Sequence, residues 1–81
     1  STLQIDGGKK HKLRPGDILG ALTRKPENKG EQAIEGSQVG KIQLFDIKAY
    51  VAVHRSITNL AIQKINEGKL KGKNFKVRCL N

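Results

Sequence analysis

The centre of the chain reads VGKIQLFDIKAYVAV over residues 39–53, and this stretch decides the fold. In its first half, Ile42 and Leu44 alternate with polar residues, as expected of a strand that buries one face. In its second half, Val51 and Val53 recur with the same period. An aspartate between the two halves favours a turn. The stretch therefore predicts two neighbouring strands joined by a short connection.

A helix is predicted on each side of this strand pair. Pro15 suits a first helical turn, and Asp17 suits the positive end of the helix dipole. Pro26 disfavours helical geometry at the residue before it, so this helix is expected to end near Arg24. After the strands, Ser56 is a suitable N-cap for a second helix, whose apolar residues recur at helical spacing.

Short alternating strands at the two ends complete the order β-α-β-β-α-β. Leu3 and Ile5 flank Gln4, and near the other end Cys79 falls in step with apolar residues, which predicts a thiol in the core. Two split β-α-β units of this length form an α+β fold, the ferredoxin-like two-layer sandwich, in which a four-stranded antiparallel sheet carries both helices on one face. The expected strands span 2–6, 39–45, 49–53 and 75–80, and the expected helices span 15–24 and 57–68.

Positive charge is the second strong feature of the chain. Sixteen lysines and arginines against seven acids leave a formal net charge of +9 on 81 residues. Nine of the sixteen lie in two clusters without an acid: Lys9, Lys10, Lys12 and Arg14, with His11 among them, and Lys69, Lys71, Lys73, Lys76 and Arg78. The first cluster follows Gly7-Gly8, and glycines let a loop backbone approach a phosphate closely. Such clustering predicts a polyanionic partner, most often nucleic acid.

The sheet face that the helices leave uncovered is predicted to be polar and basic. Alternation along the strands assigns to this outer face Gln4, Lys41, Gln43, Lys48, Tyr50, Lys76 and Arg78. An open basic sheet suits RNA, whose unpaired bases can stack on aromatic rings. Tyr50 is the one aromatic residue of the seven, which argues against a general single-strand binder that works by stacking. These residues favour a folded RNA, recognised through its phosphates and its shape.

Other classes of function find little support in the sequence. No apolar run approaches the ~18 residues of a membrane span, so no membrane partner is expected. His11, His54 and Cys79 lack metal-ligand spacing, and no Ser-His-Asp group, Walker loop or carboxylate pair points to an enzyme. The lone cysteine cannot form an internal disulfide, which favours a reducing compartment and a cytoplasmic location. The chain has no methionine, from which we expect a domain cut from a longer protein.

Several runs resemble one family, in order and along nearly the whole chain. They are IDGGKKHKLRPGDILGAL at 5–22, VGKI at 39–42, YVAV at 50–53, and KLKGK at 69–73 followed by Val77-Arg78. These runs are similar to the C-terminal RNA-binding domain of bacterial DEAD-box helicases of the DbpA family. The loop Gly7-Gly8-Lys9-Lys10, leading into Arg-Pro-Gly-Asp, is the most specific of these elements.

The resemblance implies a more specific function than charge alone. Residues 1–81 would form one RNA-binding domain, a divergent RNA recognition motif that tethers the helicase to a hairpin of 23S ribosomal RNA near the peptidyl-transferase centre. The helicase core domains of the same protein would bind ATP and Mg²⁺ and unwind nearby duplexes during large-subunit assembly. The domain itself would then be a monomer without a cofactor and without catalysis. The expected RNA-binding residues are Lys9, Lys10, His11, Lys12, Arg14, Lys41, Lys48, Tyr50, Lys69, Lys71, Lys73, Lys76 and Arg78.

Two alternatives stay open at this point. A non-specific basic RNA-binding module would use the same lysines without selecting one hairpin. A ribosome-associated protein-interaction domain would instead use the helix face, where the sequence offers mainly polar residues. By the same resemblance, the segment 24–35 is expected to be longer than in relatives of the family, so no RNA contact is transferred to it.

Overall fold

The computed structural model describes residues 1–24, 33–68, 70 and 73–80. Its strands are β1 (Thr2–Ile5), β2 (Val39–Leu44), β3 (Ala49–Val53) and β4 (Val77–Cys79), and its α-helices are α1 (Pro15–Thr23) and α2 (Thr58–Gly68). Short 3-10 turns are η1 (Lys9–His11), η2 (Gly36–Gln38) and η3 (Arg55–Ile57). The order of strands and α-helices is the predicted β-α-β-β-α-β.

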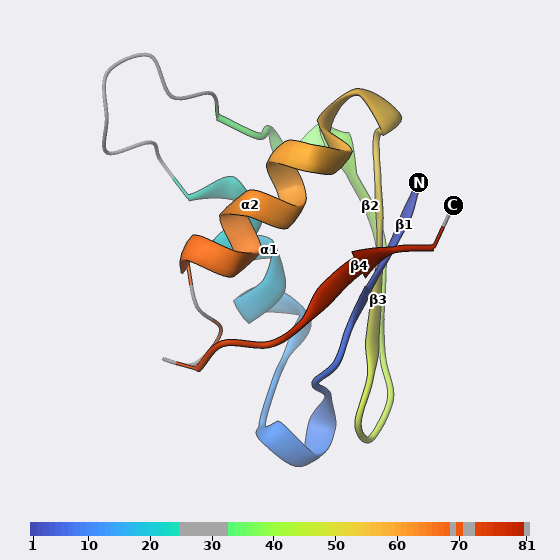
Figure 1. Cartoon of the computed structure of the whole chain (residues 1–81), viewed down its shortest axis with the longest axis vertical. Coiled ribbons are helices and arrows are strands. Elements are labelled where there is room, and N and C mark those ends of the chain that lie inside the picture. The colour runs from blue at the N-terminus through green and yellow to red at the C-terminus, as the bar shows by residue number, and fades with distance from the viewer. Residues whose placement is uncertain (25–32, 69, 71–72, 81) are drawn as a thin grey trace.

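The strands form one antiparallel sheet, and the helices cover one of its faces. Within the described residues the sheet is four-stranded, in the order β2-β3-β1-β4, with every pair antiparallel. Figure 1 shows α1 and α2 together on one side of the sheet, which is seen nearly edge-on. The predicted two-layer α+β sandwich is therefore confirmed, and the opposite sheet face is the outer face.

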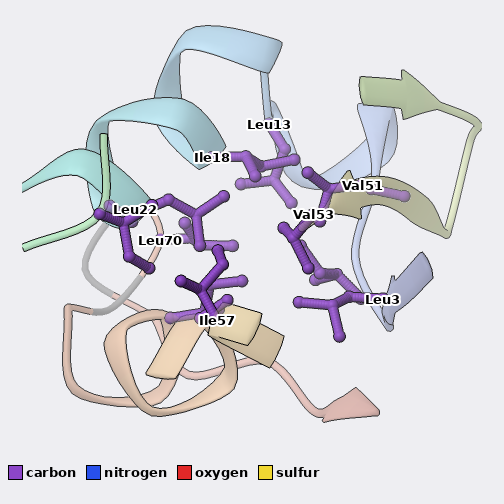
Figure 2. Packing of buried hydrophobic residues seen from close by; sticks show 14 residues of the cluster. Leu3, Leu13, Ile18, Leu22, Val51, Val53, Ile57 and Leu70 are labelled. Atoms are coloured by element: carbon purple, nitrogen blue, oxygen red, sulfur yellow. The ribbon is translucent and has the colours of Figure 1, made fainter. Parts of the chain in front are cut away.

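The core lies between the helices and the inner face of the sheet. Its buried side chains, several of which Figure 2 labels, are Leu3, Ile5, Leu13, Ile18, Ala21, Leu22, Ile34, Ala49, Val51, Val53, Ile57, Ala61, Ile65 and Leu70. Leu3 and Ile5 are fully buried on the inner face of β1, as the alternation predicted. The apolar pattern of this small domain therefore closes into one continuous core.

Helix α1 begins where the sequence predicted. Pro15 occupies its first turn, and the Asp17 carboxylate accepts a hydrogen bond from the Arg14 backbone nitrogen over 2.9 Å. This contact satisfies one backbone donor just before the helix and places negative charge at its positive end. Arg14 is the last cation of the basic loop, residues 7–14, and this hydrogen bond fixes the position of its backbone.

Helix α2 begins later than expected. Ser56 lies inside η3 rather than at the N-cap, and its backbone nitrogen donates to His54 Nδ1 over 3.2 Å. A tight 3-10 turn over Arg55–Ile57 therefore precedes the α-helix, which starts at Thr58. The helix also buries Lys64 completely, on the same stripe as its apolar residues. The lysine was not predicted in the core because charged residues are rarely buried.

The strand ends and Cys79 differ from the prediction. Asp6 and Phe45 lie just beyond β1 and β2, and Phe75 lies before the short β4. Cys79 is exposed, although it pairs with the buried Leu3, because β4 is an edge strand of three residues. The prediction of a buried thiol was therefore wrong. Neither described helix has the length and apolar character needed to cross a membrane.

Candidate nucleic-acid interface

A row of four side chains crosses the outer face of the sheet. The strand register places Gln43 opposite Tyr50, Tyr50 opposite Gln4, and Gln4 opposite Arg78. Gln43 and Arg78 are exposed and Tyr50 is half-buried. The alternation therefore assigned these four residues to the correct face.

Gln4 is less available than its position on this face suggested. It lies on a central strand between Tyr50 and Arg78, and only 5% of it is exposed. Its Nε2 atom donates to Asp6 Oδ1 over 3.1 Å. Gln4 is therefore largely inaccessible to a ligand. Its neighbours Tyr50 and Arg78 form the accessible surface at this point of the outer face.

Lys41 stands at a break in the edge strand β2. The register shifts between Val39 and Ile42, which both face the core side, and leaves Gly40 and Lys41 in the irregular segment. A Cβ atom on Gly40 would lie 3.3 Å from the Cβ of Ala52. The Lys41 side chain is exposed. The register therefore gives Lys41 no partner on β3, and its assignment to the outer face stays a prediction.

Lys48 and Lys76 extend the outer face toward one end of the sheet. Phe45 N donates to Lys48 O over 2.8 Å at the end of the β2–β3 hairpin, and Asp6 N donates to Lys76 O over 2.9 Å at the end of β1. Lys76 is exposed and Lys48 is half-buried. Both lysines therefore lie at the end of the sheet where β2 turns into β3.

The basic loop, residues 7–14, packs against that same end. Lys9 N donates to Phe45 O over 2.9 Å, and Lys10 N donates to Asp46 O over 2.8 Å. Figure 1 shows η1 beside the β2–β3 turn. These hydrogen bonds join the basic loop to the hairpin turn, so that the loop cations and the outer face form one continuous surface.

The paired glycines allow this packing. A Cβ atom on Gly8 would collide with the carbonyl oxygen of Phe45 and lie 2.8 Å from the backbone nitrogen of Lys48. A Cβ atom on Gly7 would lie 2.5 Å from the ring of Phe75. Both glycines are buried. Their close approach is to the protein itself, which differs from the expectation that they face a phosphate.

His11 fixes the shape of the basic loop. Its Nδ1 atom accepts a hydrogen bond from the Gly8 backbone nitrogen over 3.1 Å, so the ring proton of the neutral imidazole resides on Nε2. The ring is half-buried and meets Phe75 edge-on, with centroids 5.3 Å apart. The structure thus gives this predicted RNA-binding residue a structural role in holding the loop.

The loop cations are exposed and close together. Lys12 adopts the left-handed conformation with φ of 62°, and its N–H donates to Lys9 O over 2.9 Å. Lys9, Lys12, Leu13 and Arg14 line an open hollow of about 330 Å³. Three cations around one hollow give a site with the charge to hold a phosphate.

The second cluster of lysines is divided by the fold. Lys76 and Arg78 lie on the outer face, whereas Lys73 lies in the turn after α2, where its backbone pairs with that of the buried Leu70. Lys69 and Lys71 lie outside the described residues. The structure therefore brings two residues of this cluster to the outer face.

Two exposed apolar side chains beside Tyr50 were not predicted as site residues. Phe45 is 52% exposed and Ile47 is 56% exposed. The rings of Phe45 and Tyr50 meet at 76° with centroids 5.7 Å apart. The alternation that placed Gln43 outward continues to Phe45, so the pattern held the signal. Among the described residues, no cluster of His, Cys, Asp and Glu could hold a metal ion.

Comparison with known proteins gives two concordant matches. Residues 2–79 match the family model described as the DbpA RNA binding domain. The chain is also 45% identical over 80 residues to the ATP-dependent RNA helicase DbpA of Escherichia coli (strain K12). That alignment covers 99% of this chain and 16% of the relative, of which it is the C-terminal domain.

Proposed function

This chain belongs to the DbpA RNA-binding domain family, and on that premise we propose that it anchors an ATP-dependent RNA helicase to a folded RNA. The specific target proposed is a hairpin of 23S ribosomal RNA, bound during assembly of the large subunit in the cytoplasm. The chain spans 16% of the length of the relative it matches, so the helicase activity concerns the remainder of such a protein.

The observation that carries this proposal is the continuity of the basic loop with the outer face. The hydrogen bonds from Lys9 N to Phe45 O and from Lys10 N to Asp46 O hold the two in one fixed arrangement. The exposed cations along this surface are Lys9, Lys10, Lys12, Arg14, Lys41, Lys76 and Arg78. A rigid surface with charge at its end and across its face suits an RNA whose phosphates are themselves fixed by folding.

The scarcity of aromatic residues on the central strands favours a folded target over a single strand. β1 presents the buried Gln4 and β3 presents Tyr50, which leaves one ring in the middle of the outer face. A general single-strand binder stacks successive bases on several rings. Shape and phosphate recognition therefore supply most of the affinity in the proposal.

A tether of this kind needs no catalytic group of its own. When the domain holds a hairpin, the helicase core on the same chain meets neighbouring RNA at an effective concentration that reaches the millimolar range for short linkers. ATP and Mg²⁺ would bind to that core. The domain then acts as a monomer whose partners are the RNA hairpin and the attached core.

A titration of the chain with hairpins from the peptidyl-transferase region tests this function. The matched control is a hairpin of equal length with a scrambled loop and junction. We expect tighter binding of one native hairpin, with a log–log salt slope of about −3 to −6 for ~4–7 neutralised phosphates. Equal affinity for the scrambled hairpin would reduce the chain to a non-specific basic module. Absence of salt-dependent RNA binding would leave the protein-interaction alternative.

A further inference from the structure

A hollow of about 480 Å³ lies between the β2–β3 turn and the basic loop. Its lining consists of Lys9, Phe45, Asp46, Ile47, Lys48 and Tyr50. Phe45 and Ile47 expose 52% and 56% of their surfaces, although most of the large apolar side chains of the described residues are buried or half-buried. Adjacent exposed apolar side chains around a concave surface mark a binding site more often than chance exposure does.

The hollow is held open by backbone hydrogen bonds. Phe45 N donates to Lys48 O over 2.8 Å and closes the turn, while Lys9 N and Lys10 N donate to the carbonyl oxygens of Phe45 and Asp46. The absence of a side chain at Gly8 lets the loop reach the turn. These hydrogen bonds fix the backbone that carries the apolar walls, which lowers the ordering cost of binding a ligand.

The shape of the walls suits a flat ring. Phe45 and Tyr50 meet nearly at a right angle, with an interplanar angle of 76° and centroids 5.7 Å apart. Two rings in this arrangement form a corner, in which a planar group can lie against one ring and touch the edge of the other. Ile47 adds an apolar surface to the same hollow.

The charges around the hollow indicate which kind of molecule would supply the flat ring of the ligand. Lys9 and Lys48 are cationic, Asp46 is the one acid of the lining, and the exposed Lys10 follows Lys9 in the loop. An aromatic group with phosphates attached matches an apolar corner between two lysines. A nucleotide has this chemistry, whereas an apolar peptide segment would leave both cations without counter-charge.

From this geometry we infer that the hollow takes one unpaired nucleobase of the bound RNA, with its flanking phosphates beside Lys9 and Lys48. The inference rests on the proposed function, since it adds a base-binding site to the same RNA surface. It places base recognition at the end of the sheet beside the β2–β3 turn, where Tyr50 is the one lining residue that belongs to a central strand. Any base has a ring face for such a site, and the argument applies to all four.

The experiment is a double-mutant cycle between the turn and the RNA. Phe45→Ala and Phe45→Leu are titrated with the native hairpin and with hairpins that carry an abasic site at each loop position in turn. Leu19→Ala is the matched control, because Leu19 is an exposed apolar residue on α1, 38% exposed, outside the hollow. Thermal unfolding of each variant shows that the fold is retained, and the leucine variant keeps apolar volume without the ring.

We expect both Phe45 variants to bind the native hairpin about 5- to 150-fold more weakly, the range for loss of one stacked base. Their salt slopes should match that of the unaltered chain, because no phosphate contact is lost. An abasic site at one loop position should weaken binding by the unaltered chain to a similar extent. The same abasic site should cause little further loss of affinity for Phe45→Ala. Leu19→Ala should bind as the unaltered chain does.

The inference is overturned if Phe45→Ala binds the native hairpin as tightly as Leu19→Ala does. It is equally overturned if every abasic site lowers the RNA affinity of Phe45→Ala by the same factor as that of the unaltered chain. If Phe45→Ala binds RNA normally and loses affinity for the helicase core added in trans, the hollow is a protein contact instead. Failure of the unaltered chain to bind any hairpin would refute the proposed function, a result distinct from these.

Discussion

The Gly8 backbone is packed so closely against Phe45 that a Cβ atom at residue 8 would collide with the Phe45 carbonyl oxygen. This contact joins the basic loop to the β2–β3 turn, with the hydrogen bond from Lys9 N to Phe45 O directly beside it. The loop supplies cations and the turn supplies exposed apolar groups. The RNA surface proposed for this domain depends on that junction.

Substitution of Gly8 by alanine should therefore weaken both stability and RNA binding. The added methyl group forces the loop away from the backbone of the hairpin turn, which typically costs about 1–3 kcal/mol of unfolding free energy. Urea unfolding measures this loss. RNA affinity, measured without urea so that the variant is folded, should fall as well, because the loop cations would shift relative to the outer face.

Gly20→Ala is the control for this prediction. Gly20 is exposed within α1, and a Cβ atom there would meet nothing within 4 Å. Alanine has the higher helix propensity, so this variant should gain about 0.5–1 kcal/mol and bind RNA unchanged. Equal stability of the two alanine variants would contradict the packing described at Gly8.

Removal of a loop cation should change the salt dependence of RNA binding. Lys12→Ala and Arg14→Ala each remove a cation beside the hollow at the start of α1. Each should weaken binding to all RNAs alike and reduce the salt slope by about one, if it holds one phosphate. Titrations at several salt concentrations give the slope.

Arg55→Ala is the matched charge control. Arg55 is exposed in η3, which follows β3 at the end of that strand remote from the β2–β3 turn. Its removal changes the net charge equally but should leave the slope within error of the unaltered chain. Equal effects at Arg55 and Lys12 would show that total charge, rather than the basic loop, governs binding.

Tyr50 should contribute through its ring on the outer face. Tyr50→Ala should lose about 1–3 kcal/mol of RNA-binding free energy if a base stacks there. Gln43→Ala removes the next side chain of the same row and should cost less, since it has no ring to lose. An unchanged dissociation constant for Tyr50→Ala would assign recognition to the loop end of the surface alone.

His11 should matter for the fold of the loop rather than for charge. In His11→Phe the ring edge can still meet Phe75, but the buried Gly8 N–H loses its acceptor at Nδ1. An unsatisfied buried donor costs about 1–3 kcal/mol. Amide hydrogen exchange at Gly8 should accelerate, and the unfolding free energy should fall.

His54 provides the comparison, because its Nδ1 also accepts a hydrogen bond from a backbone nitrogen, but at an exposed position. Its Nδ1 accepts from Ser56 N over 3.2 Å, and its side chain is exposed. His54→Phe should change stability by no more than about 0.5 kcal/mol, since solvent can satisfy the freed donor. A larger loss at His54 than at His11 would contradict the structural role given to His11.

The fold could be predicted from the sequence because its signals are local. The alternation at residues 39–53 and the proline at the start of α1 placed the elements correctly, and the apolar stripe of α2 was identified. The errors arose where burial depends on contacts with other elements of the fold rather than on the local sequence. Cys79 has the spacing of a core residue but lies on a short edge strand, and Lys64 has the chemistry of a surface residue but is buried.

The site could be predicted only where its residues follow a local pattern. Alternation gave the row from Gln43 to Arg78 correctly, but register alone could not show that Gln4 is covered by its neighbours. Gly8 is needed for a contact with the β2–β3 turn, some forty residues later in the chain, and Gly7 for a contact with the still more distant Phe75. Contacts of this range have no local pattern, so the hollow beside Phe45 was not predicted.

The most direct test of the RNA surface is the change in backbone amide chemical shifts when the native hairpin is added to the labelled chain. We predict the largest changes at residues 7–14, in the turn at 45–48 and along Gln43, Tyr50 and Arg78. Amides of α1 beyond its first turn and of the exposed side of α2, such as those of Leu19 and Gln63, should change little. Largest changes on the two helices, with the basic loop and outer face unaffected, would contradict the account.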